Sequence, residues 1–143
     1  MEYLRTCEDS FDICIASGVL YHMRNPMETL ALTAKVAQKL LLWTHYYDAE
    51  VLAGRDDTTV RFGESTPAEF DGFQHTLHRH IYGAALELAG FCGGDAHYSN
   101  WLSREDLLAG LAHVGWRVDA IDFEDREHIN GPALALVATR VSS

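Results

Sequence analysis

Imidazole and phenol side chains follow two short apolar segments of this sequence, and their types are suited to chemistry. Residues 17–25 contain Tyr21 and His22, and residues 44–48 contain His45 with further phenols after it. Histidine titrates near neutral pH and can move a proton, whereas tyrosine holds and orients polar substrates. The two segments together predict an acid–base site that acts on a polar molecule.

Each of these residues also has a purely structural interpretation. His22 can cap the helix that follows it or hydrogen-bond to a backbone carbonyl group. Tyr46 and Tyr47 can pack the next segment of the chain against a sheet. Both interpretations stay open at the level of sequence.

A third group of histidines lies further along, in a segment that we predict to be a helix over residues 75–88, ended by Gly90 and the glycines at 93–94. His75 and His78 would lie one helical turn apart, a spacing compatible with a metal ion. No cysteine pair and no HExxH pattern accompanies them, so we expect no metal site. We expect instead partly solvated side chains, with His78 facing the substrate.

The elements that must position these groups are predicted from periodicity. Residues 11–17 form an apolar run that predicts a strand buried on both faces. Asn25 and Pro26 are typical of a helix start, and residues 39–46 predict a second buried strand. A strand, a helix and a strand over this length form a βαβ unit with parallel strands. Ligands bind at the carboxyl ends of such strands, where both groups lie.

The second half of the chain divides into a long irregular segment and a regular end. Residues 48–74 show little periodicity and predict a long loop or insertion outside the sheet. Residues 103–106, SRED, have the spacing of a capping box before another helix, which Gly115 ends. Strands are expected at 117–123 and 133–138, joined by a turn at 130–132. Since no helix separates them, they predict an antiparallel pair, and residues 1–143 form a single domain.

Bulk composition limits the classes of function. The formal net charge of -10 argues against nonspecific binding to nucleic acid, which needs a basic surface. Three cysteines without CxxC spacing fit free thiols in a reducing compartment, and no apolar run approaches the length of a membrane span. We therefore expect a cytoplasmic protein that does not insert into membranes.

Several motifs resemble those of class I S-adenosylmethionine-dependent methyltransferases. Residues 10–23, SFDICIASGVLYHM, with Asn25 and Pro26 after them, resemble the fourth-strand motif of that family. Residues 101–108, WLSREDLL, followed by Gly115 and Trp116, are similar to its last helix and glycine–aromatic ending. The terminal hairpin around residues 131–133 resembles its antiparallel final strand.

This resemblance implies an α/β fold that is only part of a Rossmann-like methyltransferase sheet. The strands would correspond to 4-5-7-6 of the family order 3-2-1-4-5-7-6, with the last strand antiparallel and with flanking helices. The glycine-rich turn that holds most of the cofactor has no counterpart, so the resemblance implies a truncated, C-terminal half of the fold. The first strand would then be an unprotected edge, and we expect self-association or a separate glycine-rich half to cover it.

The resemblance also implies a function and a set of site residues. The activity would be S-adenosylmethionine-dependent methyl transfer to a small-molecule acceptor. Ala16, Ser17 and Gly18 would lie beside the methionine part of the cofactor, and Tyr21 and His22 would face the transferred methyl group. On the substrate side, the resemblance places His45 and Tyr46. His22 is the first choice for any catalytic base.

Two other functions stay open. In one, the half-domain is a non-catalytic oligomerisation or binding module whose cleft residues are structural. In the other, histidines bind the metal of a hydrolase.

Overall fold

The main sheet has four strands in the order β1-β2-β7-β6, as predicted for the end of a methyltransferase sheet. The computed structural model describes residues 1–55, 61–87 and 96–141. Strands β1 (Phe11–Ser17) and β2 (Ala37–His45) are parallel. Strand β7 (Ala133–Arg140) runs antiparallel to both β2 and β6 (Trp116–Asp125). The predicted βαβ unit and the antiparallel end are therefore confirmed.

Two helices cover one face of this sheet. Helix α2 (Pro26–Val36) begins where predicted, because the Asn25 side chain accepts a hydrogen bond from the Glu28 backbone N–H. Helix α4 (Arg104–His113) begins with the predicted cap, in which Ser103 Oγ accepts from the Asp106 N–H at 3.0 Å. It ends at His113, and Gly115 follows with a φ of 90°, the left-handed conformation that favours glycine.

The described residues within 48–74 lie outside the main sheet, as predicted, but the expectation that they are irregular is wrong, and so is the helix predicted over 75–88. Strands β3 (Phe62–Phe70) and β4 (Phe73–Ile81) form an antiparallel hairpin, and β5 (Tyr98–Trp101) pairs with β4 to complete a second sheet. Asp71 and Gly72 both have positive φ, which is the two-residue turn that suits a twisted hairpin. The glycines proposed to end the helix, at 90, 93 and 94, lie outside the described residues.

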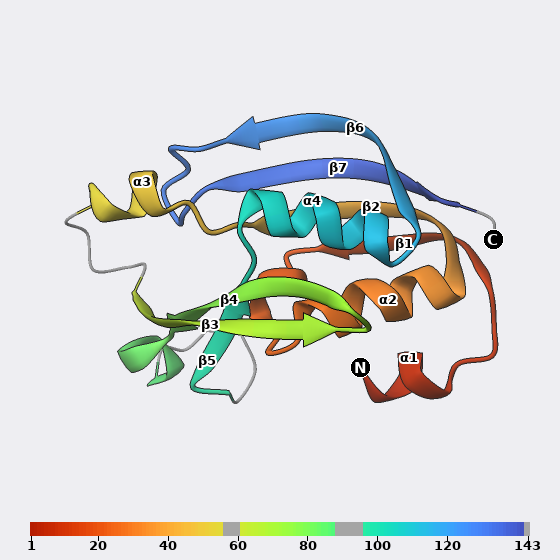
Figure 1. The fold of residues 1–143 in the computed structure, drawn as a ribbon, viewed down its shortest axis with the longest axis horizontal. Helices are drawn as coiled ribbons and strands as arrows, with labels where there is room; N and C mark the ends of the chain where they lie inside the picture. The colour runs from red at the N-terminus through yellow and green to blue at the C-terminus, as the bar shows by residue number, and fades with distance from the viewer. Residues whose placement is uncertain (56–60, 88–95, 142–143) are drawn as a thin grey trace.

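The smaller sheet, α2 and α4 all lie on the same side of the main sheet (Figure 1). A Cβ atom on Gly110 of α4 would lie 2.5 Å from Met27 Sδ of α2 and 3.4 Å from the Phe73 ring. A side chain at this position would therefore require the Met27 side chain to move, where the two helices and the hairpin meet. Four short helical segments complete the described chain: α1 (Glu2–Thr6), η1 (Leu20–His22), α3 (Ala49–Ala53) and η2 (Gly83–Glu87).

The opposite face of the main sheet carries exposed apolar side chains. The prediction that the first strand is buried on both faces is wrong, because in β1 only Ala16 is buried. Ile13 is 47% exposed and Ile15 is 66% exposed, and Leu41 of β2 continues the same open face at 38%. Strand β1 is also an edge of the sheet, as expected. The buried core thus lies on the helix side of the sheet alone.

Two smaller findings concern thiols and membranes. Cys7 and Cys14 are free, and Cys92 lies outside the described residues. Among the helices of the described chain, none has the length and apolar character needed to cross a bilayer.

Candidate functional site

The carboxyl ends of β1 and β2 meet at one rim of the main sheet. Gly18 ends β1 with a φ of 71° and donates its N–H to the Trp43 carbonyl oxygen at 3.1 Å. The following turn contains η1, and it is fixed to β5 because the Asn100 backbone N–H bonds to Met23 O and its side chain bonds to Arg24 O. The first site segment is thus held between the two sheets.

A cluster of aromatic and imidazole rings lies on this rim. The ring of Tyr21 lies 4.2 Å from that of His22 and 4.6 Å from that of His45, measured between centroids. Trp101 of the smaller sheet stacks on His45 at 5.2 Å and 7°. The prediction that residues 17–25 and 44–48 lie together at one rim of the sheet is therefore confirmed. We call the following eight residues the ring cluster: Tyr21, His22, Trp43, His45, His80, Tyr82, Trp101 and His128.

His45 is a buried imidazole with a defined tautomer. Its Nδ1 lies 2.8 Å from the carbonyl oxygen of Gly131 and 3.2 Å from that of Pro132. Carbonyl oxygens only accept, so Nδ1 carries the proton and Nε2 keeps its lone pair when the ring is neutral. Burial lowers the pKa of His45, which favours this neutral form.

His22 is half-buried and belongs to the same cluster. Its Nδ1 shares a hydrogen bond of 2.7 Å with the Tyr82 hydroxyl, which lies just beyond β4. Burial lowers the pKa of His22 as well. The imidazole is therefore neutral near pH 7 and can accept a proton there.

Of the substrate-side residues, His78 lies near the cluster and Tyr46 lies elsewhere. His78 stacks on Tyr47 with ring centroids 3.7 Å apart, its Nδ1 shares a 2.7 Å hydrogen bond with Ser65 Oγ, and burial lowers its pKa. Tyr46 is buried and donates its phenol to Glu124 at 2.9 Å. Burial, followed by the Glu124 bond, raises the pKa of Tyr46 to about 12.

The helical pairing of His75 with His78 does not occur. In a strand, residues three apart point to opposite faces, so the two imidazoles diverge. His75 stacks on Phe73, whereas His78 faces Tyr47. Within the described ranges, no group of three histidine, cysteine or acidic side chains is placed to hold a metal ion.

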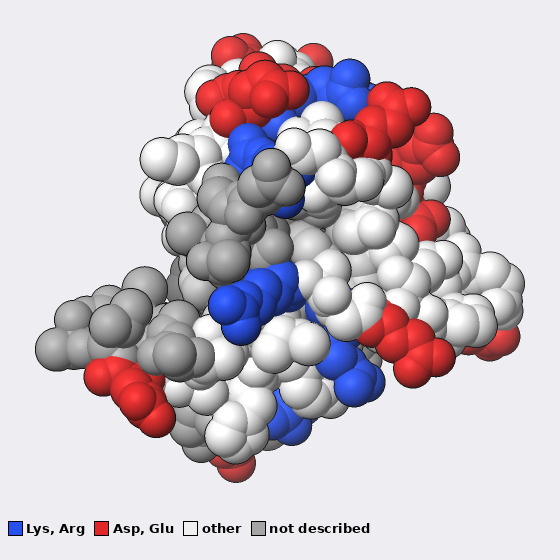
Figure 2. Space-filling view, turned by 90° about the vertical axis from the view of Figure 1, so that its left-hand side faces the viewer, with Lys and Arg blue, Asp and Glu red and all other residues white. Residues whose placement is uncertain are grey.

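A cleft of about 730 Å³ lies beside the end of β2, next to Tyr46. Its arginines are already paired, because Arg104 binds Glu124 at 2.7 Å and Arg126 binds Asp48 at 2.7 Å. Figure 2 views the molecule from this end and shows acidic side chains gathered over the β6 side of the face. These pairs tie α3 and α4 to the end of β6, and we assign the cleft a structural role.

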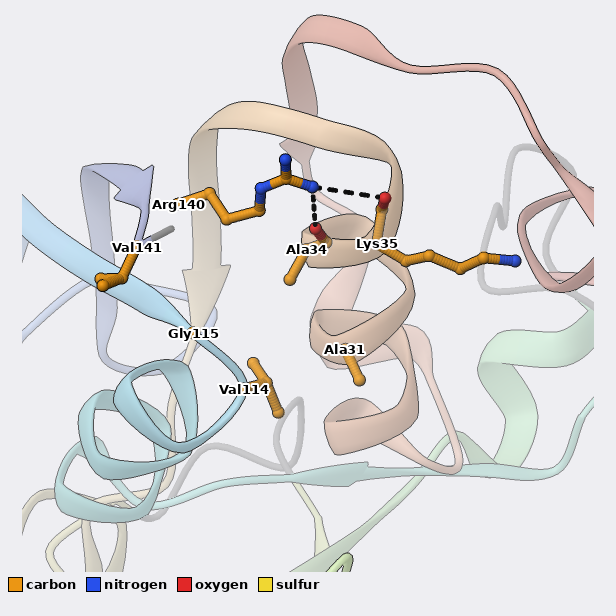
Figure 3. A pocket seen from close by; sticks show the side chains of 7 residues that line it. All are labelled: Ala31, Ala34, Lys35, Val114, Gly115, Arg140 and Val141. Carbon is orange, nitrogen blue, oxygen red and sulfur yellow. Dashed lines mark hydrogen bonds between the residues drawn. The ribbon is translucent and has the colours of Figure 1, made fainter. Parts of the chain in front are cut away.

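Another cavity, of about 500 Å³, lies at the opposite end of the sheet (Figure 3). Arg140 points across it and donates to the backbone oxygens of Ala34 and Lys35 at the end of α2, at 3.1 and 3.5 Å. Its charge thus stabilises the carboxyl end of a helix. The cavity lies at the amino end of β2, away from the ring cluster, and we assign no chemistry to it.

Five members of the ring cluster are not predicted as site residues from the sequence. Trp43, Tyr82 and His128 have no functional prediction, His80 belongs to the histidine group expected on a partly solvated helix, and Trp101 belongs to the motif of the last helix. One available signal was the sequence FDGF at 70–73, since Asp-Gly between apolar residues favours a hairpin. That hairpin would have placed His78 and His80 on one face.

The comparisons with known proteins support the fold. No family model matches the chain, and no curated protein matches it. Among solved structures, the N-terminal domain of EvdMO1, in the presence of S-adenosylhomocysteine and D-fucose, has a TM-score of 0.62 at 22% identity, covering 97% of this chain and 52% of that one. Magnesium protoporphyrin IX methyltransferase from Synechocystis PCC 6803 has a TM-score of 0.53 at 12% identity, covering 96% and 48%.

A further similar structure is an S-adenosylmethionine-dependent methyltransferase from Clostridium acetobutylicum, with a TM-score of 0.54 at 6% identity, covering 96% of this chain and 61% of that one. This chain therefore has the mixed α/β fold of methyltransferases. It spans about half the length of the EvdMO1 domain.

Proposed function

We propose that this chain takes part in S-adenosylmethionine-dependent methyl transfer to a small-molecule acceptor. The observation that carries the proposal is the ring cluster at the carboxyl ends of β1 and β2 in a methyltransferase fold. In open α/β sheets this is the rim where ligands bind. The rings offer flat apolar surfaces and titratable nitrogens within one small region.

On the cofactor side, the proposed residues are Ala16, Ser17 and Gly18. They fit a close approach of a ligand to the backbone, because all three are small and Gly18 has a positive φ. A Cβ atom at Gly18 would meet the Tyr21 hydroxyl at 3.7 Å, so Tyr21 borders the same space. S-adenosylmethionine supplies an electrophilic methyl group on a sulfonium when bound. These three residues would contact only its methionine part.

On the acceptor side, His22 is the proposed base. It is half-buried and within reach of a ligand, whereas His45 is only 6% exposed and is fixed by carbonyl oxygens. His22 would take the proton from the oxygen or nitrogen atom of the acceptor that receives the methyl group. Tyr21 and His45 would hold the acceptor in line, since alignment supplies most of the rate in such a displacement. His78 stays a proposal for the outer substrate side, whereas Tyr46, which bonds to Glu124 away from the ring cluster, has a structural role.

We also propose that the edge of β1 is where the chain associates with another body. That body is either a glycine-rich half of the fold or a second copy of this chain. Support comes from the unpaired edge and from the apolar side chains of Ile13 and Ile15 beside it. The structures that resemble this chain are longer than it is, in keeping with a further half.

Calorimetric titration with S-adenosylmethionine and S-adenosylhomocysteine tests the proposal. We expect no heat at millimolar ligand for this chain alone and micromolar binding once a glycine-rich half, taken from a similar methyltransferase, is added. A Gly18→Val variant tests the cofactor-side residues. It should abolish the micromolar binding that the glycine-rich half restores, because the positive φ is strained for valine. If the completed protein binds neither ligand, the methyl-transfer proposal is wrong.

A further inference from the structure

Three buried polar atoms of the smaller sheet have no hydrogen-bond partner among the described residues. Two of them lie on rings, Trp101 Nε1 on β5 and His80 Nδ1 on β4, and the third is Ser99 Oγ on β5. The two strands pair, and the centroids of the two rings lie 4.9 Å apart. Trp101 is only 2% exposed. An unsatisfied buried donor costs about 1–3 kcal/mol, so native proteins seldom keep one that has no use.

Trp101 Nε1 and His80 Nδ1 belong to the ring cluster and not to the general core. Trp101 stacks on His45, and its edge meets the ring of Phe62 at 5.0 Å. His80 packs against Tyr82, which bonds to the proposed base His22. The unpartnered atoms therefore lie on the side of the cluster formed by the smaller sheet, across from the rim of the main sheet.

The chemistry of the two groups restricts what they can bind. An indole N–H only donates, so the ligand must present an acceptor atom to Trp101. His80 is neutral near pH 7, because burial, and then the neighbouring His22 and His45, lower its pKa to about 4. A carboxylate or phosphate here would lose its hydration without meeting a formal positive charge from the ring cluster. A neutral oxygen suits both groups.

We propose that Trp101 Nε1 and His80 Nδ1 hold one hydroxyl oxygen of a neutral, hydroxylated ring, which packs its face on the half-buried rings of the cluster. This inference rests on the proposed function, because that ring would be the methyl acceptor. A hydroxyl group can accept from the indole and donate to the imidazole, which satisfies both atoms at once. Trp101 and His80 are then binding residues that select the acceptor, and His22 acts on another of its hydroxyl groups.

The test follows the three indole N–H signals of the full chain by ¹H–¹⁵N NMR while a probe is added. Methyl β-glucopyranoside and catechol are two neutral hydroxylated rings, one aliphatic and one aromatic, and benzoate is the anionic control. Trp116 is an internal control, because its Nε1 already donates to Leu30 O in the core at 3.3 Å. We expect at least one neutral probe to shift the Trp101 signal saturably, with Trp116 and benzoate giving no change.

The Trp101→Phe variant keeps an aromatic ring and removes the unpartnered donor together with part of the buried indole. It should weaken binding of the active probe about tenfold, the value of one hydrogen bond, and urea unfolding checks that the variant still folds. His80→Gln, which keeps a polar group at this position, is the second variant and should also weaken binding. A Trp101 signal that neither neutral probe moves, or that benzoate moves equally, would overturn the inference and assign the indole to a buried water.

This readout needs no cofactor and no methyl transfer. A saturable Trp101 shift in a protein that never binds S-adenosylmethionine would retain the ring site and reject the methyltransferase proposal. Cofactor binding without a Trp101 shift would retain the methyltransferase proposal and reject the ring site.

Discussion

At the scale of single residues, His22 is the side chain on which the proposed chemistry depends most. It is half-buried, its Nδ1 is fixed by the Tyr82 hydroxyl, and the rings of Tyr21 and His45 lie close by. An imidazole in this setting must be neutral to accept a proton. Burial lowers its pKa, which keeps it neutral over a wider pH range than a free histidine.

The first prediction concerns this base. In a protein completed by a glycine-rich half, His22→Gln should lower kcat by about 10²–10⁴, the usual contribution of a general base. For the wild type, the acid limb of the pH–kcat profile should have its midpoint below 6.5, because the lowered pKa of His22 means that the imidazole is protonated only at lower pH. Steady-state kinetics between pH 5 and 9 would measure both. A variant with unchanged turnover at every pH would remove His22 from the mechanism.

At the scale of elements, the hairpin of β3 and β4 shows what the sequence could and could not predict. Strand β1 was predicted with its observed bounds, and both helix caps were found, because apolar runs and capping residues are local signals. The hairpin was missed because its apolar and histidine residues also fit a helical period. The Asp71–Gly72 pair, whose positive φ values form the turn, is the local signal that favours the hairpin.

The contact between His80 and Trp101, which completes the ring cluster, depends on strand pairing and not on a local sequence signal. His80 and Trp101 are brought together by pairing between strands separated by a long segment of the chain. No local pattern encodes that pairing, so this side of the ring cluster could not be predicted from the sequence. The rim formed by Tyr21, His22 and His45 was within it, because parallel strands of one βαβ unit bring their carboxyl ends together.

The second prediction tests the turn. Gly72→Ala should destabilise the protein by about 1 kcal/mol, because alanine is strained at a φ of 83°. Gly54→Ala is the control, since Gly54 has right-handed backbone angles and room for a Cβ atom at 3.8 Å. Urea unfolding of the two variants should show a loss for the first and no loss for the second. Equal midpoints would mean that the hairpin does not depend on this turn.

A third prediction concerns the contact between α2 and α4. Gly110→Ala should cost about 1–3 kcal/mol, because the new methyl group meets Met27 Sδ at 2.5 Å and forces this fully buried side chain to move. Ala109→Ser, on the exposed side of α4, should change stability by less than about 0.5 kcal/mol. Thermal unfolding followed by circular dichroism compares them, and a Gly110→Ala variant as stable as the wild type would show that this contact is loose.

At the scale of the whole molecule, the buried imidazoles couple stability to pH. The folded-state pKa of His80 is lowered to about 4, and burial also lowers the pKa values of His22 and His45. The folded state therefore binds fewer protons than the unfolded state once the pH falls below about 6.5. The stability due to these neutral rings is complete above that pH and is lost progressively as the pH falls toward 4.

The fourth prediction follows from this loss of stability as the pH falls. Between pH 7 and pH 5 the free energy of unfolding should fall, with about 1–2 kcal/mol of the loss due to His80 after allowance for its partial exposure. His80→Gln should remove that share, whereas His97→Gln, at an exposed position, should keep the wild-type slope. Urea titrations at four pH values would measure it. Parallel slopes for all three proteins would show that His80 is not held neutral by the fold.

The last prediction concerns association of the chain through the open face of the main sheet. Ile13 and Ile15 of β1 and Leu41 of β2 present apolar side chains to water beside an unpaired strand edge. Contiguous apolar surface next to such an edge favours pairing with another chain or domain. If β1 is the surface of association, a charge placed there must weaken that association while leaving the fold intact.

Ile15→Glu should therefore shift the chain toward the monomer in light scattering, and should prevent a glycine-rich half from restoring cofactor binding. The fold should tolerate it, since Ile15 is already 66% exposed. Ile129→Glu is the matched control, because Ile129 is 74% exposed in the loop between β6 and β7 and lies off the sheet. It should change neither readout. If both variants associate like the wild type, the β1 edge is not the interface, and any further half of the fold must dock elsewhere.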